Sequence, residues 1–338
     1  MNRTTIIAEA GINHNGKLDL ALKLIDVAIS SGADIVKFQT FSADALVTVD
    51  AEMAEYQKKN TTNANSQLEM LRNLELSMED LIIIRDYCQE KNIEFLSTAF
   101  DVPSLEVLVD LGCKRIKIAS GEMTNKPFLD AAASFNLPIL LSTGMASMDE
   151  IEWAVSTLLN KGLDKSQLTI LHCTTNYPAE PEELNLLAIK SIAGHFDLSV
   201  GYSDHSLGTD ASLSAISLGS SVIEKHITLD IKMNGPDHAA SMNPTDFADF
   251  IRRIRRLESS LGNGIKTPHD AEIANRLVVR KSIVASKIIR KGDIFSQDNI
   301  TTKRPGTGIS ARYYSDMIGR KANRNYNENE LIDNECLK

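Results

Sequence analysis

Eight short runs rich in Ile, Val and Leu recur in the first 230 residues, and amphipathic segments of helical length separate them. The runs are TIIAEAG (5–11), ADIVKFQ (33–39), IEFLST (93–98), RIKIAS (115–120), PILLST (138–143), LTILHC (168–173), LSVGYS (198–203) and SVIEKH (221–226). This alternation predicts parallel strands joined by helical crossovers. Eight such units in about 260 residues are the number and length expected of an α/β protein with a (β/α)8 TIM barrel.

The segments between the runs carry the helical pattern. Predicted helices lie near 18–30, 77–91, 103–111, 127–135, 147–160, 184–193, 209–219 and 244–261. The alternative architecture is a doubly wound open sheet. Such a sheet usually carries a glycine-rich phosphate-binding fingerprint after its first strand, and this chain has none. The barrel is therefore the preferred interpretation.

Two stretches depart from the alternating pattern. Residues 41–76 are too long for an ordinary strand-to-helix turn, so we expect an active-site loop partly ordered by its own helix. From about residue 280, short strand-like runs separated by KGD, RPGTG and NEN turns predict a compact β-rich module. The predicted domains are a catalytic TIM barrel at 1–262, a linker at 263–279 and a small β-rich domain at 280–338.

Composition and charge exclude several classes of function. A hydrophobic content of 43% and a net charge of −9 describe an acidic globular protein, without the basic surface that nucleic acids or anionic membranes require. No window approaches the roughly 18 continuous apolar residues of a membrane span. The four cysteines are scattered without a CxxC motif and the N-terminus lacks a signal-peptide pattern, so a cytoplasmic location is expected.

Every predicted strand ends in polar or ionisable residues. In chain order these are Glu9 with Asn13 and His14, Lys37 and Gln39, Ser97 and Asp101, Ser120 and Glu122, Ser142 and Thr143, Thr174 and Tyr177, Ser203 with His205, and His226. The strands of a TIM barrel all end at one face, where the active site of such enzymes lies. We therefore expect these side chains to form a single site.

Two histidines stand out within this set. His205 and His226 each follow a strand-like run, so neighbouring strands would bring both imidazoles to the same end of the barrel. Two neutral imidazoles suit Mn, Fe, Co or Zn and leave coordination positions for water and substrate. On spacing alone, ordinary hydrogen-bonded histidines are the more frequent explanation, and both interpretations stay open at this point.

Ten motifs, in one consistent order, give the chain a close resemblance to a known family. They are AEAGINHNG (8–16), VKFQTF (36–41), LSTAFD (96–101), KIASGE (117–122), LSTGMA (141–146), LHCTTNYP (171–178), GYSDHSLG (201–208), EKHITLD (224–230), GPDHAASMNP (235–244) and TTKRPGTGIS (301–310). The chain resembles the bacterial sialic acid synthases, which condense phosphoenolpyruvate with an N-acylated sugar. The tail resembles their antifreeze-like (SAF, β-clip) domain, which caps the partner's active site, so the resemblance implies a domain-swapped homodimer.

The resemblance also implies roles for individual residues. A divalent metal, Mn2+ with Mg2+ or Co2+ as alternatives, would be held by His205 and His226. Glu122 is the favoured general acid or base, with Glu9 as the competing carboxylate. The phosphoenolpyruvate ligands implied are Lys37, Lys117, Ser120, Ser142, Ser203 and Thr175. The sugar ligands implied are Gln39, Tyr177, Asp237 and, from the partner subunit, the residue equivalent to Arg304.

The predicted activity is therefore a phosphoenolpyruvate-dependent transferase that makes a nine-carbon 2-keto-3-deoxy acid. The first hypothesis is N-acetylneuraminate from N-acetylmannosamine. The alternative is N,N'-diacetyllegionaminate from 2,4-diacetamido-2,4,6-trideoxymannose, with the same C–O cleavage of phosphoenolpyruvate. A Schiff-base aldolase that uses Lys117 or Lys225 as nucleophile is a further alternative. A binding or structural protein built on the antifreeze-like module is a third.

Overall fold

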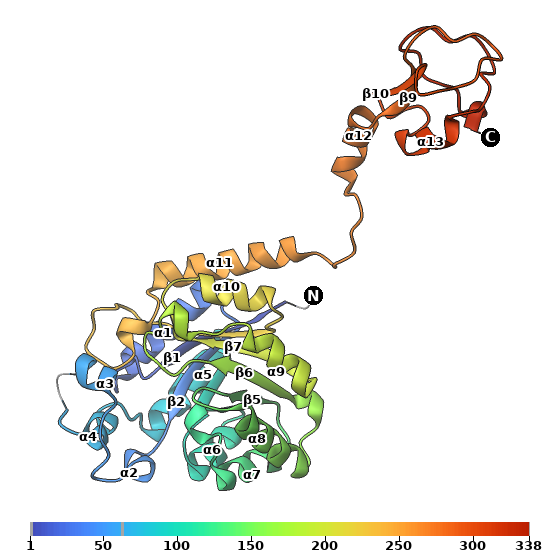
Figure 1. Ribbon diagram of the computed structural model, residues 1–338. Coiled ribbons are helices and arrows are strands. Elements are labelled where there is room, and N and C mark those ends of the chain that lie inside the picture. The colour runs from blue at the N-terminus through green and yellow to red at the C-terminus, as the bar shows by residue number, and fades with distance from the viewer. Residues whose placement is uncertain (1–2, 62–63, 338) are drawn as a thin grey trace. The chain divides into compact units, whose positions relative to one another are not determined.

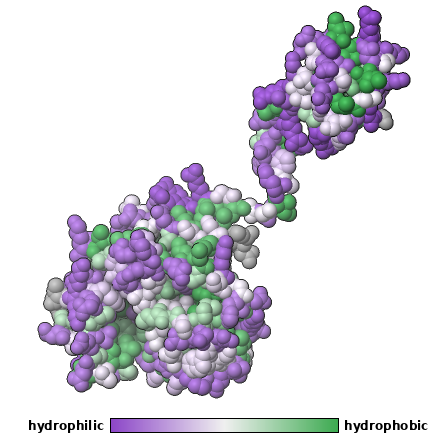
Figure 2. All heavy atoms as spheres, viewed as in Figure 1, coloured by the Kyte–Doolittle hydropathy of each residue, from purple (hydrophilic) through white to green (hydrophobic). Residues whose placement is uncertain are grey.

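The computed structural model describes residues 3–61 and 64–337, which divide into two compact units. The N-terminal unit ends at Asn263 and the C-terminal unit begins at Gly264 (Figure 1). Figure 2 shows mainly hydrophilic residues on the visible surface of both units, with the hydrophobic residues in small groups. Among the described residues, no helix combines the length and the apolar character that crossing a membrane requires.

The N-terminal unit is a closed barrel of parallel strands, as predicted. The strands are β1 (Thr5–Gly11), β2 (Ile35–Thr40), β3 (Glu94–Ala99), β4 (Ile116–Ile118), β5 (Ile139–Ser142), β6 (Leu168–Cys173), β7 (Ser199–Asp204) and β8 (Val222–His226). Each strand pairs with the next along the chain, and β1 closes the ring against β8, with Glu9 opposite His226. This topology confirms the TIM barrel and rules out the open sheet.

Helices follow the strands and pack around the outside of the barrel. They are α1 (Leu18–Ser31), α5 (Met78–Glu90), α6 (Val102–Asp110), α7 (Lys126–Ser134), α8 (Met148–Asn160), α9 (Ala188–Phe196), α10 (Asp210–Ser217) and α11 (Pro244–Leu261). Ser77 and Ser147 begin α5 and α8 with reciprocal capping hydrogen bonds. The helix predicted at 184–193 begins later, at Ala188, because Asn185 has a φ of 43° that helical backbone does not allow.

The barrel interior has an apolar layer beneath a polar one. The apolar layer is a buried cluster formed by Ile7, Ile35, Leu96, Leu140, Leu171 and Val222. Side chains two residues apart on a strand face the same way, so the next inward residues are Glu9, Lys37, Thr98, Ser142, Cys173 and Glu224. The polar side chains at the carboxyl ends of the strands therefore rest on a packed apolar floor.

The excursion at 41–76 is more structured than the single helix predicted. Its described residues form three short helices: α2 (Ala43–Leu46), α3 (Glu55–Asn60) and α4 (Gln67–Arg72). Residues 62–63 lie outside the described part of the chain. Two hydrogen bonds tie α3 to the segment after β8: Asn60 Nδ2 donates to the carbonyl of Pro236 at 3.1 Å, and Gly235 N donates to the carbonyl of Asn60 at 3.2 Å.

The C-terminal unit has its own small core. Its regular sheet consists of β9 (Ser282–Ala285) and β10 (Ile300–Lys303), which are antiparallel. Isolated bridges, such as Val284 to Leu331, take the place of the other predicted strands. Helix α13 is Tyr314–Met317, and helix α12 (Asp270–Val279) lies within the segment predicted as a linker. The buried core of this unit includes Ile283, Phe295, Ile300, Met317 and Tyr326.

Candidate active site

One cavity of about 360 Å³ opens at the carboxyl ends of the barrel strands. It is lined by thirteen of the fourteen residues to which the resemblance gives a role: Glu9, Lys37, Gln39, Lys117, Ser120, Glu122, Ser142, Thr175, Tyr177, Ser203, His205, His226 and Asp237. This is the face on which TIM-barrel enzymes carry their active sites. The fold brings these residues together, while their individual roles remain predictions.

The other polar strand-end residues expected in the site are not among the described residues that line this cavity: Asn13, His14, Ser97, Asp101, Thr143 and Thr174. Ser97, for example, precedes Thr98 on β3 and so faces the other side of the strand.

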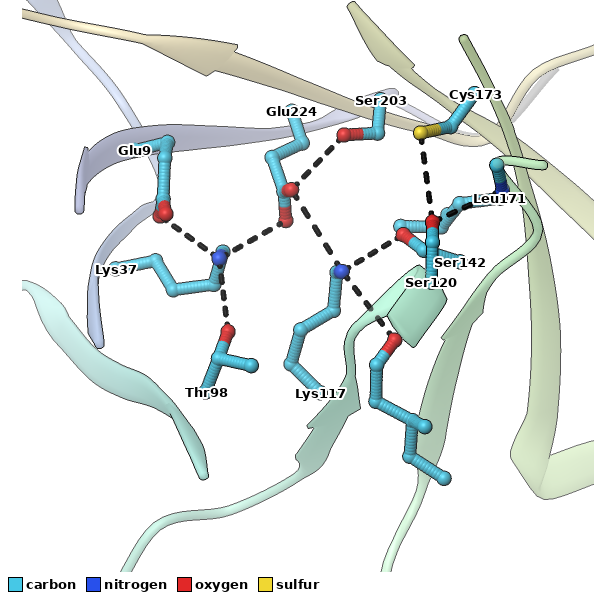
Figure 3. A network of polar contacts seen from close by, with 12 residues as sticks. Glu9, Lys37, Thr98, Lys117, Ser120, Ser142, Leu171, Cys173, Ser203 and Glu224 are labelled. Carbon is cyan, nitrogen blue, oxygen red and sulfur yellow. Dashed lines mark hydrogen bonds and ion pairs between the residues drawn. The ribbon is translucent and has the colours of Figure 1, made fainter. Parts of the chain in front are cut away.

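Lys37 lies at the centre of a buried charged cluster (Figure 3). Its Nζ is 2.8 Å from Glu9 Oε2 and 3.6 Å from Glu224 Oε2, and it donates a hydrogen bond to Thr98 Oγ1 at 2.9 Å. Burial raises the pKa of Glu9 to about 7, although the charge of Lys37 opposes the shift. This carboxyl therefore gains and loses a proton near neutral pH.

Lys117 belongs to the same cluster, on the other side of Glu224 (Figure 3). Its Nζ donates to Ser142 Oγ at 2.7 Å and is 3.7 Å from Glu224 Oε1, which also accepts a hydrogen bond from Ser203 Oγ at 3.0 Å. Burial would raise the pKa of Glu224, but the charges of Lys117 and Lys37 outweigh burial and bring it to about 2. With Glu9 protonated, the cluster carries two cations and one anion, so it attracts a negative ligand.

Beside this cluster, the backbone at Gly144 comes close to the side chains of Ser120 and Thr175. Ser120 Oγ accepts a hydrogen bond from Gly144 N at 2.9 Å. A Cβ atom at position 144 would collide with Thr175 Oγ1 and would lie 2.9 Å from Ser120 Oγ. Glycine at this position therefore leaves room for the two hydroxyls, both of which line the cavity.

The two histidines lie at the carboxyl ends of neighbouring strands, His205 just after β7 and His226 as the last residue of β8, with ring centroids 5.4 Å apart. His205 Nδ1 is 2.6 Å from the carbonyl oxygen of Thr174, which can only accept, so the ring donates from Nδ1 and in its neutral form carries the lone pair on Nε2. Burial lowers the pKa of His226 well below its usual value, so this ring is neutral. Its Nδ1 is buried without a hydrogen-bond partner and is 3.8 Å from Asp237 Oδ2.

These features fit a divalent metal held by the two imidazoles. The lone pair of His205 Nε2 is set by a backbone hydrogen bond, and the buried Nδ1 of His226 lacks a partner that an ion would supply. Across residues 3–61 and 64–337, no group of three or more His, Cys, Asp or Glu side chains could enclose an ion. A metal at this position would therefore take its remaining ligands from water and substrate.

Tyr177 forms the wall beside the histidines. Its ring lies 4.1 Å from His205 and 5.8 Å from His226 between centroids, and it stacks on Tyr56 at 5.0 Å. Tyr56 belongs to α3, so the 41–76 excursion reaches the cavity. Burial raises the pKa of Asp237, on the same side, to about 6.

Glu122 and Gln39 are the other polar groups of the predicted sugar side. Glu122 Oε2 accepts a hydrogen bond from Asn125 Nδ2 at 2.6 Å, and partial burial raises the pKa of this carboxyl above its usual value. Gln39 Nε2 donates to Glu9 Oε1 at 3.3 Å. Glu122 and Glu9 are thus two carboxyls with raised pKa values in one cavity, which is a frequent property of groups that transfer protons.

Lys225 is in a different place from the other predicted lysines. It is not among the described residues that line the cavity. Its Nζ is 2.9 Å from Asp204 Oδ2 and donates to the carbonyl of Ser206 at 2.5 Å, with the side chain almost fully buried. A Schiff-base mechanism on Lys225 therefore has no access to substrate, and only Lys117 remains for that alternative.

Arg304 belongs to the C-terminal unit, where it follows β10 and precedes a cis peptide bond to Pro305. Its role as a sugar ligand stays a prediction.

Several residues that line the cavity were not predicted from the sequence. Glu224 is the most prominent, and it could have been found because it precedes His226 by two residues on the same strand and so faces the same way. Thr98 and Cys173 lie two residues after Leu96 and Leu171 of the apolar layer, on β3 and β6, and so also face the barrel interior. Tyr56 had no such signal, because only the folding of the excursion brings α3 to the barrel mouth.

Comparisons with known proteins agree with the fold. The chain is 50% identical over 335 residues to N,N'-diacetyllegionaminic acid synthase of Campylobacter jejuni, covering 98% of this chain and 99% of the relative. The enzyme of the same name from Legionella pneumophila is 46% identical, with coverage of 95% and 90%. A crystal structure of N-acetylneuraminic acid synthetase from Leptospira borgpetersenii aligns with a TM-score of 0.73 at 34% identity, covering 81% of this chain and 90% of that one.

The family assignment rests on two matches, one mainly in each unit of the structure. Residues 280–338, in the C-terminal unit, match the SAF domain. Residues 24–266, most of the barrel unit, match the NeuB family. With this match over more than half of its length, and with relatives of high identity along nearly the whole sequence, the chain belongs to the NeuB family.

Proposed function

We propose that the protein is a nonulosonate synthase that condenses phosphoenolpyruvate with 2,4-diacetamido-2,4,6-trideoxymannose to give N,N'-diacetyllegionaminate and phosphate. The observation that carries the reaction class is the buried pair Lys37 and Lys117 beside two histidines in one cavity. The sugar rests on identity, which is 50% and 46% to two diacetyllegionaminic acid synthases and 34% to the sialic acid synthetase. The higher identity to the diacetyllegionaminic acid synthases favours the diacetamido sugar, which was the alternative hypothesis from the sequence. N-acetylmannosamine becomes the second candidate.

Phosphoenolpyruvate would bind at the charged end of the cavity. Its phosphate and carboxylate bring about three negative charges, which require cations and hydrogen-bond donors. Lys37 and Lys117 supply the cations, and Ser120, Ser142 and Thr175 supply hydroxyl donors. Ser203, the fourth predicted hydroxyl, lines the same cavity but donates its proton to Glu224 Oε1. Glu224 lies 3.6 Å from Lys37 Nζ and 3.7 Å from Lys117 Nζ, where its charge favours the ammonium form of both, so it would position the lysines for the substrate.

The reaction forms one carbon–carbon bond and breaks one carbon–oxygen bond. C3 of phosphoenolpyruvate bonds to the aldehyde carbon C1 of the open-chain sugar, whose oxygen takes a proton. Water adds at C2 and loses one proton. The C2–O bond to phosphate then breaks, and the departing phosphate takes the proton of the new C2 hydroxyl, which leaves the keto group. Two proton transfers before phosphate departs therefore need a partner near neutral pH. Glu122 and Glu9 are the carboxyls whose raised pKa values suit them to these transfers.

The histidines would hold a divalent metal, with Mn2+ as the proposed ion and Mg2+ or Co2+ as alternatives. Imidazole nitrogen together with substrate oxygen suits such borderline ions. When bound, the ion would supply Lewis-acid polarisation of the sugar carbonyl. Tyr177 packs against both rings and restricts their orientation.

We also propose the hydroxyl and acyl contacts, the assembly and the location. Gln39, Tyr177 and Asp237 line the cavity with groups that bind sugar hydroxyls. Arg304 of a second subunit would reach the N-acyl group, which requires a homodimer with exchanged SAF units. A cytoplasmic location agrees with four cysteines that are all free and buried, since oxidising compartments favour disulfides.

The Schiff-base alternative now depends on Lys117 alone. The ammonium of Lys117 donates to Ser142 and faces the ionised Glu224, although burial lowers the pKa of Lys117. Treatment with borohydride and pyruvate would trap such an adduct. Inactivation by a chelator without trapping would exclude it.

Phosphate release from phosphoenolpyruvate tests the proposed function. The assay contains Mn2+ and either the diacetamido sugar or N-acetylmannosamine, with and without EDTA, and mass spectrometry identifies the product. We expect turnover with the diacetamido sugar, a product of the mass of diacetyllegionaminate, and loss of activity with EDTA. Absence of phosphate release with both sugars would contradict the proposal.

A further inference from the structure

The 41–76 segment lines the cavity with uncharged side chains, although the segment itself is rich in charge. The residues that it contributes to the cavity are Phe41, Leu46, Val47, Tyr56, Gln57, Gln67, Met70 and Leu71. Its charged residues are Asp44, Asp50, Glu52, Glu55, Lys58, Lys59, Glu69, Arg72 and Glu75. None of these nine is among the described residues that line the cavity. The segment therefore presents an uncharged wall to the substrate.

The aliphatic part of this wall is held in place by a core of its own. Phe41, Met70 and Leu71 are buried members of a cluster with Ile12 and Leu68, and Leu46 and Val47 pack against that cluster. Met70 is only 2% exposed, and the rings of Phe41 and Phe100 meet edge to face at 6.1 Å. We call Leu46, Val47, Met70 and Leu71 the apolar wall. It is a preformed surface, with little freedom to rearrange around a polar group.

The chemistry of the reaction decides which end of the sugar can meet the apolar wall. Phosphoenolpyruvate needs the charged end of the cavity, at Lys37 and Lys117, and the aldehyde carbon must contact its C3. The remote end of the sugar must therefore extend away from the lysines. The cavity residues that do not belong to the charged cluster or the histidine pair include the sugar-side polar groups Gln39 and Glu122 and the apolar wall. The remote carbon of the sugar is C6.

The apolar wall discriminates among the groups that C6 can carry. The side chains of the wall offer no N–H or O–H donor and no oxygen acceptor, so a hydroxymethyl group placed there would lose water without gaining a partner. A C6 phosphate would in addition face no cation, since Lys37 and Lys117 are the only Lys or Arg residues among the described cavity lining. A methyl group has neither cost and buries apolar surface.

We propose that the apolar wall selects the sugar at C6, accepting the methyl group of a 6-deoxy sugar and disfavouring a hydroxymethyl or phosphate-bearing carbon. This inference rests on the proposed function, because it assumes a sugar aldehyde in this cavity. It adds the structural determinant of sugar choice, and it assigns that determinant to the excursion after β2. Gln57 and Gln67 line the same cavity and are available for the amide of an acetamido substituent.

The test compares sugars that differ only at C6. N-acetylmannosamine, its 6-deoxy analogue and its 6-phosphate are assayed for phosphate release at saturating phosphoenolpyruvate and Mn2+. An apolar pocket rejects an added hydroxyl by up to about 100-fold. We expect kcat/KM for the 6-deoxy analogue to exceed that for N-acetylmannosamine by about 10- to 100-fold, and the 6-phosphate to be the poorest of the three.

Two substitutions then locate the preference. Val47→Thr adds a hydroxyl with almost no change of shape, and Met70→Gln adds an amide of similar length. Each is expected to reduce the preference for the 6-deoxy analogue by about threefold or more, because it gives O6 a hydrogen-bond partner. Val49→Thr is the matched control, since Val49 lies on the same segment but is 77% exposed and is not among the cavity-lining residues. It should leave the preference unchanged.

The outcomes separate the inference from the proposed function. Two results would overturn the role of the apolar wall while leaving the synthase reaction intact. The first is turnover in which N-acetylmannosamine is used as well as, or better than, its 6-deoxy analogue. The second is a preference for the 6-deoxy analogue that neither Val47→Thr nor Met70→Gln reduces. Phosphate release with no sugar, the diacetamido sugar included, would refute the proposed function and the inference together.

Discussion

Replacing Lys225 with methionine should destabilise the barrel strongly. Lys225 and Asp204 are an ion pair with side chains 1% and 0% exposed and 2.9 Å between Nζ and Oδ2. Methionine is of similar length, so the main cost is the buried carboxylate that loses its cation. Breaking a buried pair in this way costs about 3–5 kcal/mol. Asp204 keeps hydrogen bonds from Ser206 and Ser212, so we expect the lower end of this range, about 3 kcal/mol.

Urea unfolding followed by tryptophan fluorescence measures this loss. Trp153 is the only tryptophan in the sequence and lies on α8 in the barrel unit, so it reports on the barrel. The double variant Asp204→Asn/Lys225→Met removes both charges and should be more stable than Lys225→Met alone. Lys190→Met, on the exposed face of α9, serves as the control and should change the free energy of unfolding by less than about 0.5 kcal/mol. A loss below about 1 kcal/mol for Lys225→Met, or a double variant no more stable, would refute the argument.

Three further predictions concern the site. The pKa of Glu9, raised by burial to about 7, means that its carboxylate forms beside Lys37 as the pH rises through neutrality and competes with the substrate anion. The KM for phosphoenolpyruvate should therefore increase between about pH 6 and 8, and Glu9→Gln should show a flatter profile than the parent protein; parallel profiles would contradict this role. Glu122→Gln should lower kcat by about 10²- to 10⁴-fold with little change in the urea midpoint, and an unchanged kcat would remove Glu122 from proton transfer. Mixing Arg304→Ala protein with His205→Ala protein should restore part of the activity if the SAF units are exchanged between subunits. If mixed dimers are shown to form and no activity returns, Arg304 acts in the site of its own chain.

The sequence was sufficient to predict the barrel, because the pattern of strand-like runs that indicates it is local and repeats along the chain. Strand-like runs at regular spacing predicted eight strands, and the observed strands differ from those runs by a few residues at their ends. The largest local difference is at β4, which ends at Ile118 because Ser120–Glu122 turn into a short 3-10 helix. This turn places Ser120 and Glu122 at the cavity, so the prediction of their position held although the strand was shorter.

The structure of the excursion at 41–76 could not be predicted from local sequence patterns. Its polar middle indicated a long loop, but its three short helices rest on a cluster that includes Ile12 from the β1–α1 turn. Contacts between residues so far apart in the chain leave no periodic pattern in the sequence. The same reason explains why Tyr56, stacked on Tyr177, and the apolar wall were not predicted as parts of the site.

The sequence by itself determined the architecture and the set of polar strand ends, because strand period and barrel topology force those side chains to one face. Only the tertiary structure decided how they are paired. Glu224 lies between Lys37 and Lys117, while Lys225, its neighbour in sequence, faces the opposite side and pairs with Asp204. The physical reason is that burial and charge partners set the protonation and accessibility of each group, and these depend on residues that meet only in the folded barrel.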